Sequence, residues 1–187
     1  MRLCLSRLSL SLCALVMLNA CVSQAVAPRS YLDEETAVTI TIVAEPWIFT
    51  DKHFTYSAKD RNYLKLFAVD VNRMGEHRQY LAMLVSGIPR SLLEAETVTL
   101  DLDGGGQHLS LQPTTDDLRQ LGISKPLAPT FSMTARWWYF PVGKDILATV
   151  VRSKDLKVVL VAAERRIEYA AWRDGSAETA ELTTVLP

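Results

Sequence analysis

Apolar and polar residues alternate along several short segments of this chain, and the alternation limits the folds it can adopt. In residues 36–44, Val38, Ile40 and Ile42 take every second position, with threonines between them. Successive side chains of a β-strand point to opposite faces, so this spacing is typical of a strand with one buried face. The sequence therefore predicts that the folded part opens with a strand.

Turn residues separate further segments of the same kind. The strongest pairs are 63–72 with 79–86, 97–102 with 107–111, and 156–163 with 167–172. A further strand is expected at 131–140, and shorter extended pieces at 47–49 and 53–56. Gly75 lies inside the first pair and supplies the positive φ that a tight hairpin needs. Since parallel strands need long crossover connections, these short links predict antiparallel pairing.

Short helices are expected beside the strands. Residues 114–122 begin with a threonine cap, carry acids in the first turn and end at Gly122. Residues 144–152 and 176–186 are the other candidates. We therefore predict one mainly β domain of roughly seven to nine strands over residues 36–187, either an antiparallel β-sandwich or an α+β domain with short helices.

The amino-terminal segment has the features of an export signal. Arg2 and Arg7 make it basic, and residues 8–18 form an apolar run of 11 residues. That length is typical of a signal-peptide core and is too short for a membrane-spanning helix, which needs about 20 residues. After Val22 no apolar stretch approaches that length.

The sequence Leu18-Asn19-Ala20-Cys21 at the end of this segment resembles the lipobox of bacterial lipoproteins. The resemblance implies a signal peptide over residues 1–20, cleavage before Cys21, a diacylglyceryl group on its sulfur and acylation of the new amine. Two or three acyl chains hold a protein firmly on a bilayer, at about 0.8 kcal/mol per buried CH₂. By analogy with enteric lipoproteins, Val22 after the cysteine favours an outer-membrane location facing the periplasm.

Cleavage before Cys21 has a consequence for the fold. It removes Cys4 and Cys13, so the lipoprotein has no intramolecular disulfide and depends on its core alone for stability. Two other fates of the segment stay open. An ordinary secretory signal has small residues for cleavage after Ala25 or Ala27, and an uncleaved segment would remain as an anchor.

The residues between the cysteine and the first strand are polar. Residues 22–35 contain Pro28 and show no sustained periodicity. We interpret residues 21–35 as the lipidated Cys21 followed by a flexible tether, which spans about 20 Å as a random chain. The expected role of this tether is to lift the domain above the lipid headgroups.

Charge excludes one class of partner. Loss of residues 1–20 leaves 18 basic and 21 acidic residues. A nucleic-acid-binding domain needs a basic face, which this balance does not favour. It also gives no reason for strong electrostatic attraction to anionic lipid, and the basic residues of the front half are interpreted as an ordinary solvated surface.

The sequence contains no recognisable catalytic motif. There is no G-x-S-x-G, S-x-x-K, H-E-x-x-H or P-loop pattern, and the lack of cysteine after position 21 excludes a thiol nucleophile or a thiolate zinc site in the domain. His53, His77 and His108 are not spaced as local metal ligands. We predict no metal and no cofactor apart from the lipid on Cys21.

The acidic, glycine-rich segment 101–106 has several interpretations. Carboxylates beside a tight turn suit calcium, but Gly105 and Gln112 stand where an EF-hand needs ligands. Glycines also cradle phosphate, but that use needs a following helix, and residues 107–111 alternate as a strand does. A hairpin turn is the favoured interpretation. Asp101 and Asp103 are then expected to share one face of their strand.

Adjacent tryptophans mark the segment 131–140. In a strand, Trp137 and Trp138 point to opposite faces, so one is free to enter the core while the other covers the reverse face. If that face is open, the indole becomes a stacking platform for a sugar or an anchor for a protein. Short helices covering both faces are the alternative. Trp47 and Trp172 carry the same ambiguity.

Two functions are consistent with these features. The first is a membrane-anchored envelope lipoprotein that presents a non-catalytic β-rich domain to a protein or peptidoglycan partner, with Trp137 and Trp138 as candidate contact residues. The alternative is a lipid-anchored periplasmic hydrolase acting on cell wall or glycan, with Asp101, Asp103 or the histidines assembled by the fold. A structure separates them, because an enzyme needs an acid and a base that converge in one cleft.

Overall fold

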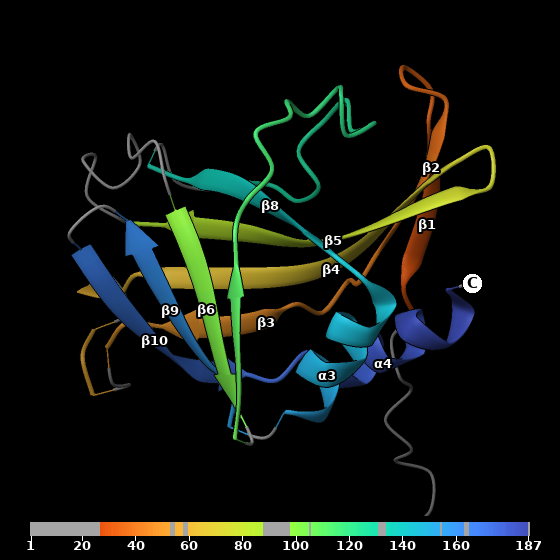
Figure 1. The fold of residues 1–187 in the computed structure, drawn as a ribbon. Helices are drawn as coiled ribbons and strands as arrows, with labels where there is room; N and C mark the ends of the chain where they lie inside the picture. Colours follow the sequence, from red (N-terminus) through yellow and green to blue (C-terminus); the bar gives the residue numbers. More distant parts are fainter. Residues whose placement is uncertain are drawn as a thin grey trace, which may run out of the picture.

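The computed structural model describes residues 27–52, 55–57, 60–87, 98–104, 106–130, 134–153, 155–162 and 165–186. The predicted signal peptide and Cys21 therefore lie outside the described residues, as do His53 and Phe54 of the expected extended piece 53–56. The described elements are β1 (Arg29–Asp33), β2 (Val38–Ile42), β3 (Trp47–Thr50), β4 (Tyr63–Arg73), β5 (Glu76–Ser86), β6 (Val98–Gly104), β7 (Gln107–Leu111), β8 (Arg136–Val142), α3 (Lys144–Arg152), β9 (Lys157–Ala162), β10 (Arg165–Arg173) and α4 (Ser176–Val185) (Figure 1).

The strands form one ten-stranded antiparallel sheet, which confirms the prediction of a mainly β, antiparallel domain with short helices. The sheet has one more strand than the upper bound of that prediction. In the part of the chain that the structure describes, no helix is long and apolar enough to cross a bilayer.

β4 organises the sheet. One of its edges pairs with β5 along all 11 residues, and β5 pairs in turn with β8. The other edge is shared, because β3 pairs with Tyr63–Leu66 while β2 pairs with Val69–Asn72. From β3 the sheet continues through β10, β9 and β6 to β7. Of these, β10, β9 and β6 cross β4, β5 and β8 at a steep angle (Figure 1).

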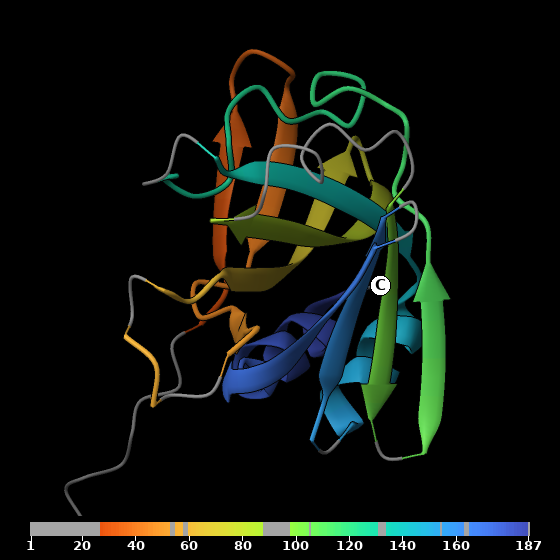
Figure 2. The same ribbon diagram turned by 90° about the vertical axis from the view of Figure 1, so that its left-hand side faces the viewer.

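The sheet is curled, and α3 and α4 pack together at one end of it (Figure 2). Strand side chains that alternate with polar neighbours meet apolar helix side chains in a single core. Its members include Leu66, Met83, Phe140, Leu160, Leu147 and Leu182, each fully or almost fully buried. α3 has the bounds that the sequence predicted, and α4 ends one residue earlier than expected.

The β4–β5 hairpin shows how local sequence determines register. Arg73 pairs with Glu76, so Met74 and Gly75 form a two-residue loop. Both loop residues have positive φ, 53° and 91°, which matches the twist of the flanking strands. Because side chains alternate strictly along a strand, this loop decides which residues of both long strands enter the core.

The segment 114–122 forms one turn, and the prediction of a helix there is wrong. The N–H of Gly122 donates to the carbonyl of Arg119, and the N–H of Ile123 donates to that of Leu118, so the turn ends at a glycine with φ +87°. At the start of the segment, the N–H of Thr114 donates to the Tyr139 carbonyl of β8, at 2.8 Å.

Part of the segment 21–35, which was expected to be a flexible tether, belongs to the sheet. Residues 29–33 form β1, which pairs with β2 along its whole length. At the end of this strand the buried Asp33 accepts hydrogen bonds from the backbone of residues 35, 36 and 124. The folded domain therefore begins at Arg29 rather than at Thr36.

Candidate functional site

Strands β10, β9, β6 and β7 place several polar side chains on the outer face of the sheet. The inward residues of these strands are apolar, and β9 also carries Val159 and Val161 on its outer face. The strand register arranges the outward residues in rows. Lys157 of β9 lies opposite Asp103 of β6, and Asp103 lies opposite His108 of β7. In the next row, Asp101 lies between Val159 and Ser110.

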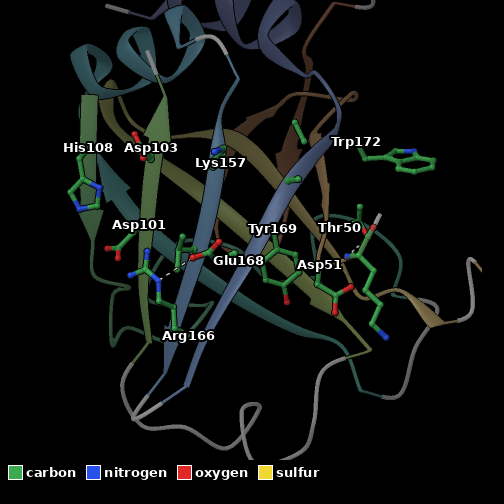
Figure 3. Close-up of a pocket in the computed structure, with 14 residues that line it drawn as sticks. Thr50, Asp51, Asp101, Asp103, His108, Lys157, Arg166, Glu168, Tyr169 and Trp172 are labelled. Carbon is green, nitrogen blue, oxygen red and sulfur yellow. Dashed lines mark hydrogen bonds and ion pairs between the residues drawn. The ribbon is translucent and has the colours of Figure 1, made fainter. Parts of the chain in front are cut away.

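A hollow of about 470 Å³ lies over these rows (Figure 3). The acidic residues that line it come from the end of β3, from β6 and from β10. The basic residues come from the end of β3, from β9 and from β10. The charged and aromatic members are Asp51, Lys52, Asp101, Asp103, His108, Lys157, Arg166, Glu168, Tyr169 and Trp172. Both signs of charge are therefore available within one surface depression, which we call the outer hollow.

Some of these groups are already paired. Asp101 accepts a hydrogen bond from the Ser110 hydroxyl at 2.8 Å, and Arg166 lies 3.5 Å from a carboxylate oxygen of Glu168. By contrast, the exposed side chains of Asp103, His108 and Lys157 make no hydrogen bond or ion pair with any residue that the structure describes. These three groups line the outer hollow and are available to form hydrogen bonds or ion pairs with a ligand.

Tyr169 lies beneath the outer hollow and is 1% exposed. Its hydroxyl has no hydrogen-bond partner among the described residues, although Figure 3 shows its ring close to Asp51. Burial raises the pKa of this hydroxyl, and the negative charge of Asp51 raises it further. The phenol therefore stays neutral and carries an uncompensated polar atom inside the protein.

Tyr169→Phe is expected to leave the domain at least as stable as the wild type, with a gain of up to about 1 kcal/mol. The reason is that an unpaired buried hydroxyl costs about 1–3 kcal/mol of desolvation, which the phenyl ring avoids while filling almost the same space. Urea unfolding of the two proteins measures the difference. A clear loss of stability would show that the hydroxyl does have a partner in solution.

Trp172 lies at the rim of the outer hollow and is 48% exposed. The guanidinium carbon of Arg61 lies 4.8 Å from the centre of the indole ring. Stacking on an arginine restrains the ring while half of its surface stays accessible to solvent. Figure 3 shows the ring projecting away from the strands. Trp172 is thus the exposed tryptophan among the ambiguous positions.

Trp137 and Trp138 do not provide the exposed indole that their candidate role required. Trp138 is 7% exposed and has the Arg136 guanidinium 5.0 Å from its ring centre. Trp137 is half-buried on the opposite face, where its ring centre lies 5.4 Å from that of Phe67. Trp138 is therefore buried and Trp137 half-buried, but the segment 112–118 that lies against β8 is not one of the short helices of the alternative interpretation. Trp47 is buried as well.

The histidines do not converge. Nδ1 of His77 lies 2.8 Å from a carboxylate oxygen of the buried Asp70, whereas His108 lines the outer hollow on a different strand. Across the described residues, no three His, Cys, Asp or Glu side chains are grouped as a metal site requires. The segment 101–106 belongs to the β6–β7 hairpin, in which Gly104 pairs with Gln107, as its favoured interpretation predicted.

Comparison of the chain with protein-family models, curated proteins and solved structures finds no match. The chemistry of the site therefore rests on its geometry. The outer hollow presents an unpaired carboxylate, ammonium and imidazole at one end and an aromatic plane at the other. Such a surface binds a polar ligand by charge pairing and stacking. The carboxylates Asp101 and Asp103 share a face, as expected, and meet His108 there.

Proposed function

We propose that this protein is a membrane-anchored envelope lipoprotein whose β-rich domain binds a cell-wall or protein partner at the outer hollow. Lipid on Cys21 would hold the domain at the outer membrane, facing the periplasm, and no nucleic acid is involved. The observation that carries the binding role is the set of unpaired groups, Asp103, His108 and Lys157, in one depression with the exposed ring of Trp172.

The shape of the site supports binding in preference to catalysis. The outer hollow lies over exposed strand faces, and a carboxylate oxygen of Asp101 is held by Ser110. A general acid or base acts best in a site that excludes water, where its pKa can be tuned to its task. An open polar surface supplies charge attraction and hydrogen bonds to a bound partner.

A lipid-anchored hydrolase acting on cell wall or glycan is the second candidate. One observation favours it, since Asp101, Asp103 and His108 line the same hollow. Alternate residues of a strand lie about 6.6 Å apart, a separation that falls within the range for the two carboxyl groups of inverting glycosidases. Both carboxylates lie on one strand, however, whereas such enzymes place them on either side of the bond that breaks.

Cys21→Ala is expected to abolish fatty-acid incorporation and to release the protein from the membrane fraction. The resemblance at residues 18–21 makes this sulfur the site of lipid attachment, and loss of every acyl chain removes the membrane affinity they supply. Labelled palmitate uptake and cell fractionation measure both effects. Cys13→Ala is the matched control and should behave as the wild type.

Mass spectrometry of the natural product provides the decisive outcome for the anchor. The proposal expects a first residue of Cys21 carrying acyl groups. A first residue after Cys21, without fatty acid, would contradict membrane anchoring. This outcome would leave the hollow and its chemistry unaffected.

A further inference from the structure

The unused groups of the outer hollow lie in a definite order across the sheet. His108, Asp103 and Lys157 follow one another on β7, β6 and β9. Lys157 in turn lies opposite Ala170 of β10, and Trp172 comes two residues later on that strand. Figure 3 shows the same order, with His108 and Trp172 at opposite sides of the view.

Small side chains separate the charged end from the aromatic end. Ala170 and Ala171 of β10 line the outer hollow between Lys157 and Trp172, together with the buried Thr50 of β3. Both alanines are exposed in the part of the chain that the structure describes, so a ligand can lie along this path against the backbone. We call this path from Trp172 to Asp103 the lane.

The lane has the length of a short peptide. Neighbouring strands lie about 4.8 Å apart and residues rise about 3.3 Å along a regular strand, which places the Cα atom of Trp172 roughly 8 Å from that of Lys157 and roughly 12 Å from that of Asp103. The register of β10 with β3 shifts between Ala171 and Arg173, so Trp172 lies at an irregular position of the strand. A tripeptide spans up to about 10 Å when extended, before its side chains are added. A ligand with a ring on Trp172 and three residues therefore reaches both charged groups.

The order of chemistry along the lane selects the ligand. An exposed indole stacks on the apolar face of a sugar ring. Lys157 pairs with a carboxylate and Asp103 with an ammonium group, and each charge-assisted hydrogen bond is stronger than a neutral one. Asp101, two residues before Asp103 on the same face of β6, borders the position of the ammonium group.

We propose that the outer hollow binds a sugar-linked peptide of the peptidoglycan type, with the sugar on Trp172, a peptide carboxylate on Lys157 and the ammonium group of a diamino acid on Asp103. This inference deepens the proposed function and rests on it, because it names the chemistry of the partner at the same site. His108, beside Asp103, supplies a further hydrogen-bonding group at the peptide end.

Calorimetric titration of the full-length protein in mild detergent tests the inference with three soluble probes. They are N-acetylmuramyl-L-alanyl-γ-D-glutamyl-L-lysine, the same tripeptide without the sugar, and N-acetylmuramyl-L-alanyl-D-isoglutamine, which lacks the ammonium group. The first probe is expected to bind most tightly, because it alone uses both ends of the lane.

The variants should separate the two ends. Trp172→Ala is expected to raise the Kd of both sugar-containing probes about 3- to 10-fold and to leave the free tripeptide unchanged, from the usual strength of a stacking contact. Trp172→Phe should restore most of the loss. Asp103→Asn is expected to weaken the two lysine-containing probes and to leave the isoglutamine probe unchanged.

Controls keep the outcome interpretable. Glu181→Gln removes a carboxylate from an exposed position of α4, outside the residues that line the outer hollow, and should change no Kd. Circular dichroism establishes that each variant is folded. Absence of binding, or equal losses for all probes in both lane variants, would overturn the inference.

Failure of this inference can be told apart from failure of the proposed function. Acylated Cys21 together with absent probe binding would leave the anchor in place and remove peptidoglycan as the ligand. Mass spectrometry of the first probe after incubation covers the enzymatic alternative. An intact probe is expected, and a cleaved one would overturn the binding role in favour of the hydrolase.

Discussion

Glu178→Ala is expected to lower the free energy of unfolding by about 3 kcal/mol. The carboxylate of Glu178, on the first turn of α4, accepts hydrogen bonds from the backbone N–H groups of Ala44 and Glu45, and the residue is 4% exposed. These two residues lie where the chain leaves β2 and has not yet entered β3. Without the carboxylate, two partly buried donors lose their acceptor, at about 1–3 kcal/mol each.

Urea unfolding measures this effect as a lower midpoint at an unchanged m value. Glu178→Gln is the informative companion, because its amide keeps one acceptor oxygen but presents an N–H₂ to the other donor, so an intermediate loss is expected. Glu181→Ala on the same helix is exposed and should stay within about 0.5 kcal/mol of the wild type. Equal stability of Glu178→Ala and wild type would contradict the stabilising role of the two hydrogen bonds that Glu178 accepts.

The same contact explains why the break between β2 and β3 was only partly predictable. Alternation predicted a strand within residues 36–44 and an extended piece at 47–49, and the structure has strands at Val38–Ile42 and Trp47–Thr50. The two strands share one edge of β4, and the connection between them is held by Glu178, which is 134 residues away from Ala44 in the chain. Local patterns carry no information about a partner so distant.

The sequence pattern did not predict β1, for a different reason. Its first four residues are exposed and only Asp33 is buried, so the strand has no apolar face for a period-two pattern to reveal. It is held by backbone pairing with β2 and by the contacts of Asp33. The 63–86 hairpin lacks this problem, because both of its strands are apolar where they cross the core.

The candidate site was predictable in part. The shared face of Asp101 and Asp103 follows from strand alternation alone. Lys157 and Glu168 were missed, although each occupies a polar position beside apolar neighbours in a strand and was detectable as an outward residue. Which outward face stays open was not predictable, since β8 is covered by a segment that was expected to be a helix.

Gly122 lies at the end of the segment that was expected to be a helix, and it packs against other strands of the sheet. A Cβ atom at this position would lie 3.2 Å from the Val38 side chain and 3.3 Å from that of Val71, so the turn rests directly on β2 and β4. The Thr36 hydroxyl donates to the Gly122 carbonyl. The turn and the start of β2 are therefore held together by a hydrogen bond. Asp33 adds a further contact with the same segment, through the N–H of Ser124.

Asp33→Ala is expected to lower the free energy of unfolding by about 2 kcal/mol. One carboxylate oxygen of Asp33 accepts from the N–H groups of Glu35 and Thr36, and the other accepts from the N–H of Ser124, at 2.8 Å. The alanine leaves these donors without their acceptor and releases the covering segment from β1. Chemical denaturation quantifies the loss, and Glu34→Gln, at an exposed neighbouring position, should change little.

The pH dependence of this loss tests its cause. Burial opposes ionisation of Asp33, but the hydrogen bonds from Ser124, Thr36 and Glu35 outweigh it and hold the pKa of the carboxyl below its ordinary value of 3.8. Folding therefore favours the carboxylate, whose stabilising contribution is fully present above pH 3.8 and disappears as the pH falls through the lower folded-state pKa. The stability difference between wild type and Asp33→Ala should be constant near neutral pH and shrink in acid. A difference that persists unchanged down to about pH 2.5 would show that packing of the side chain, rather than its charge, fastens β1 to the turn.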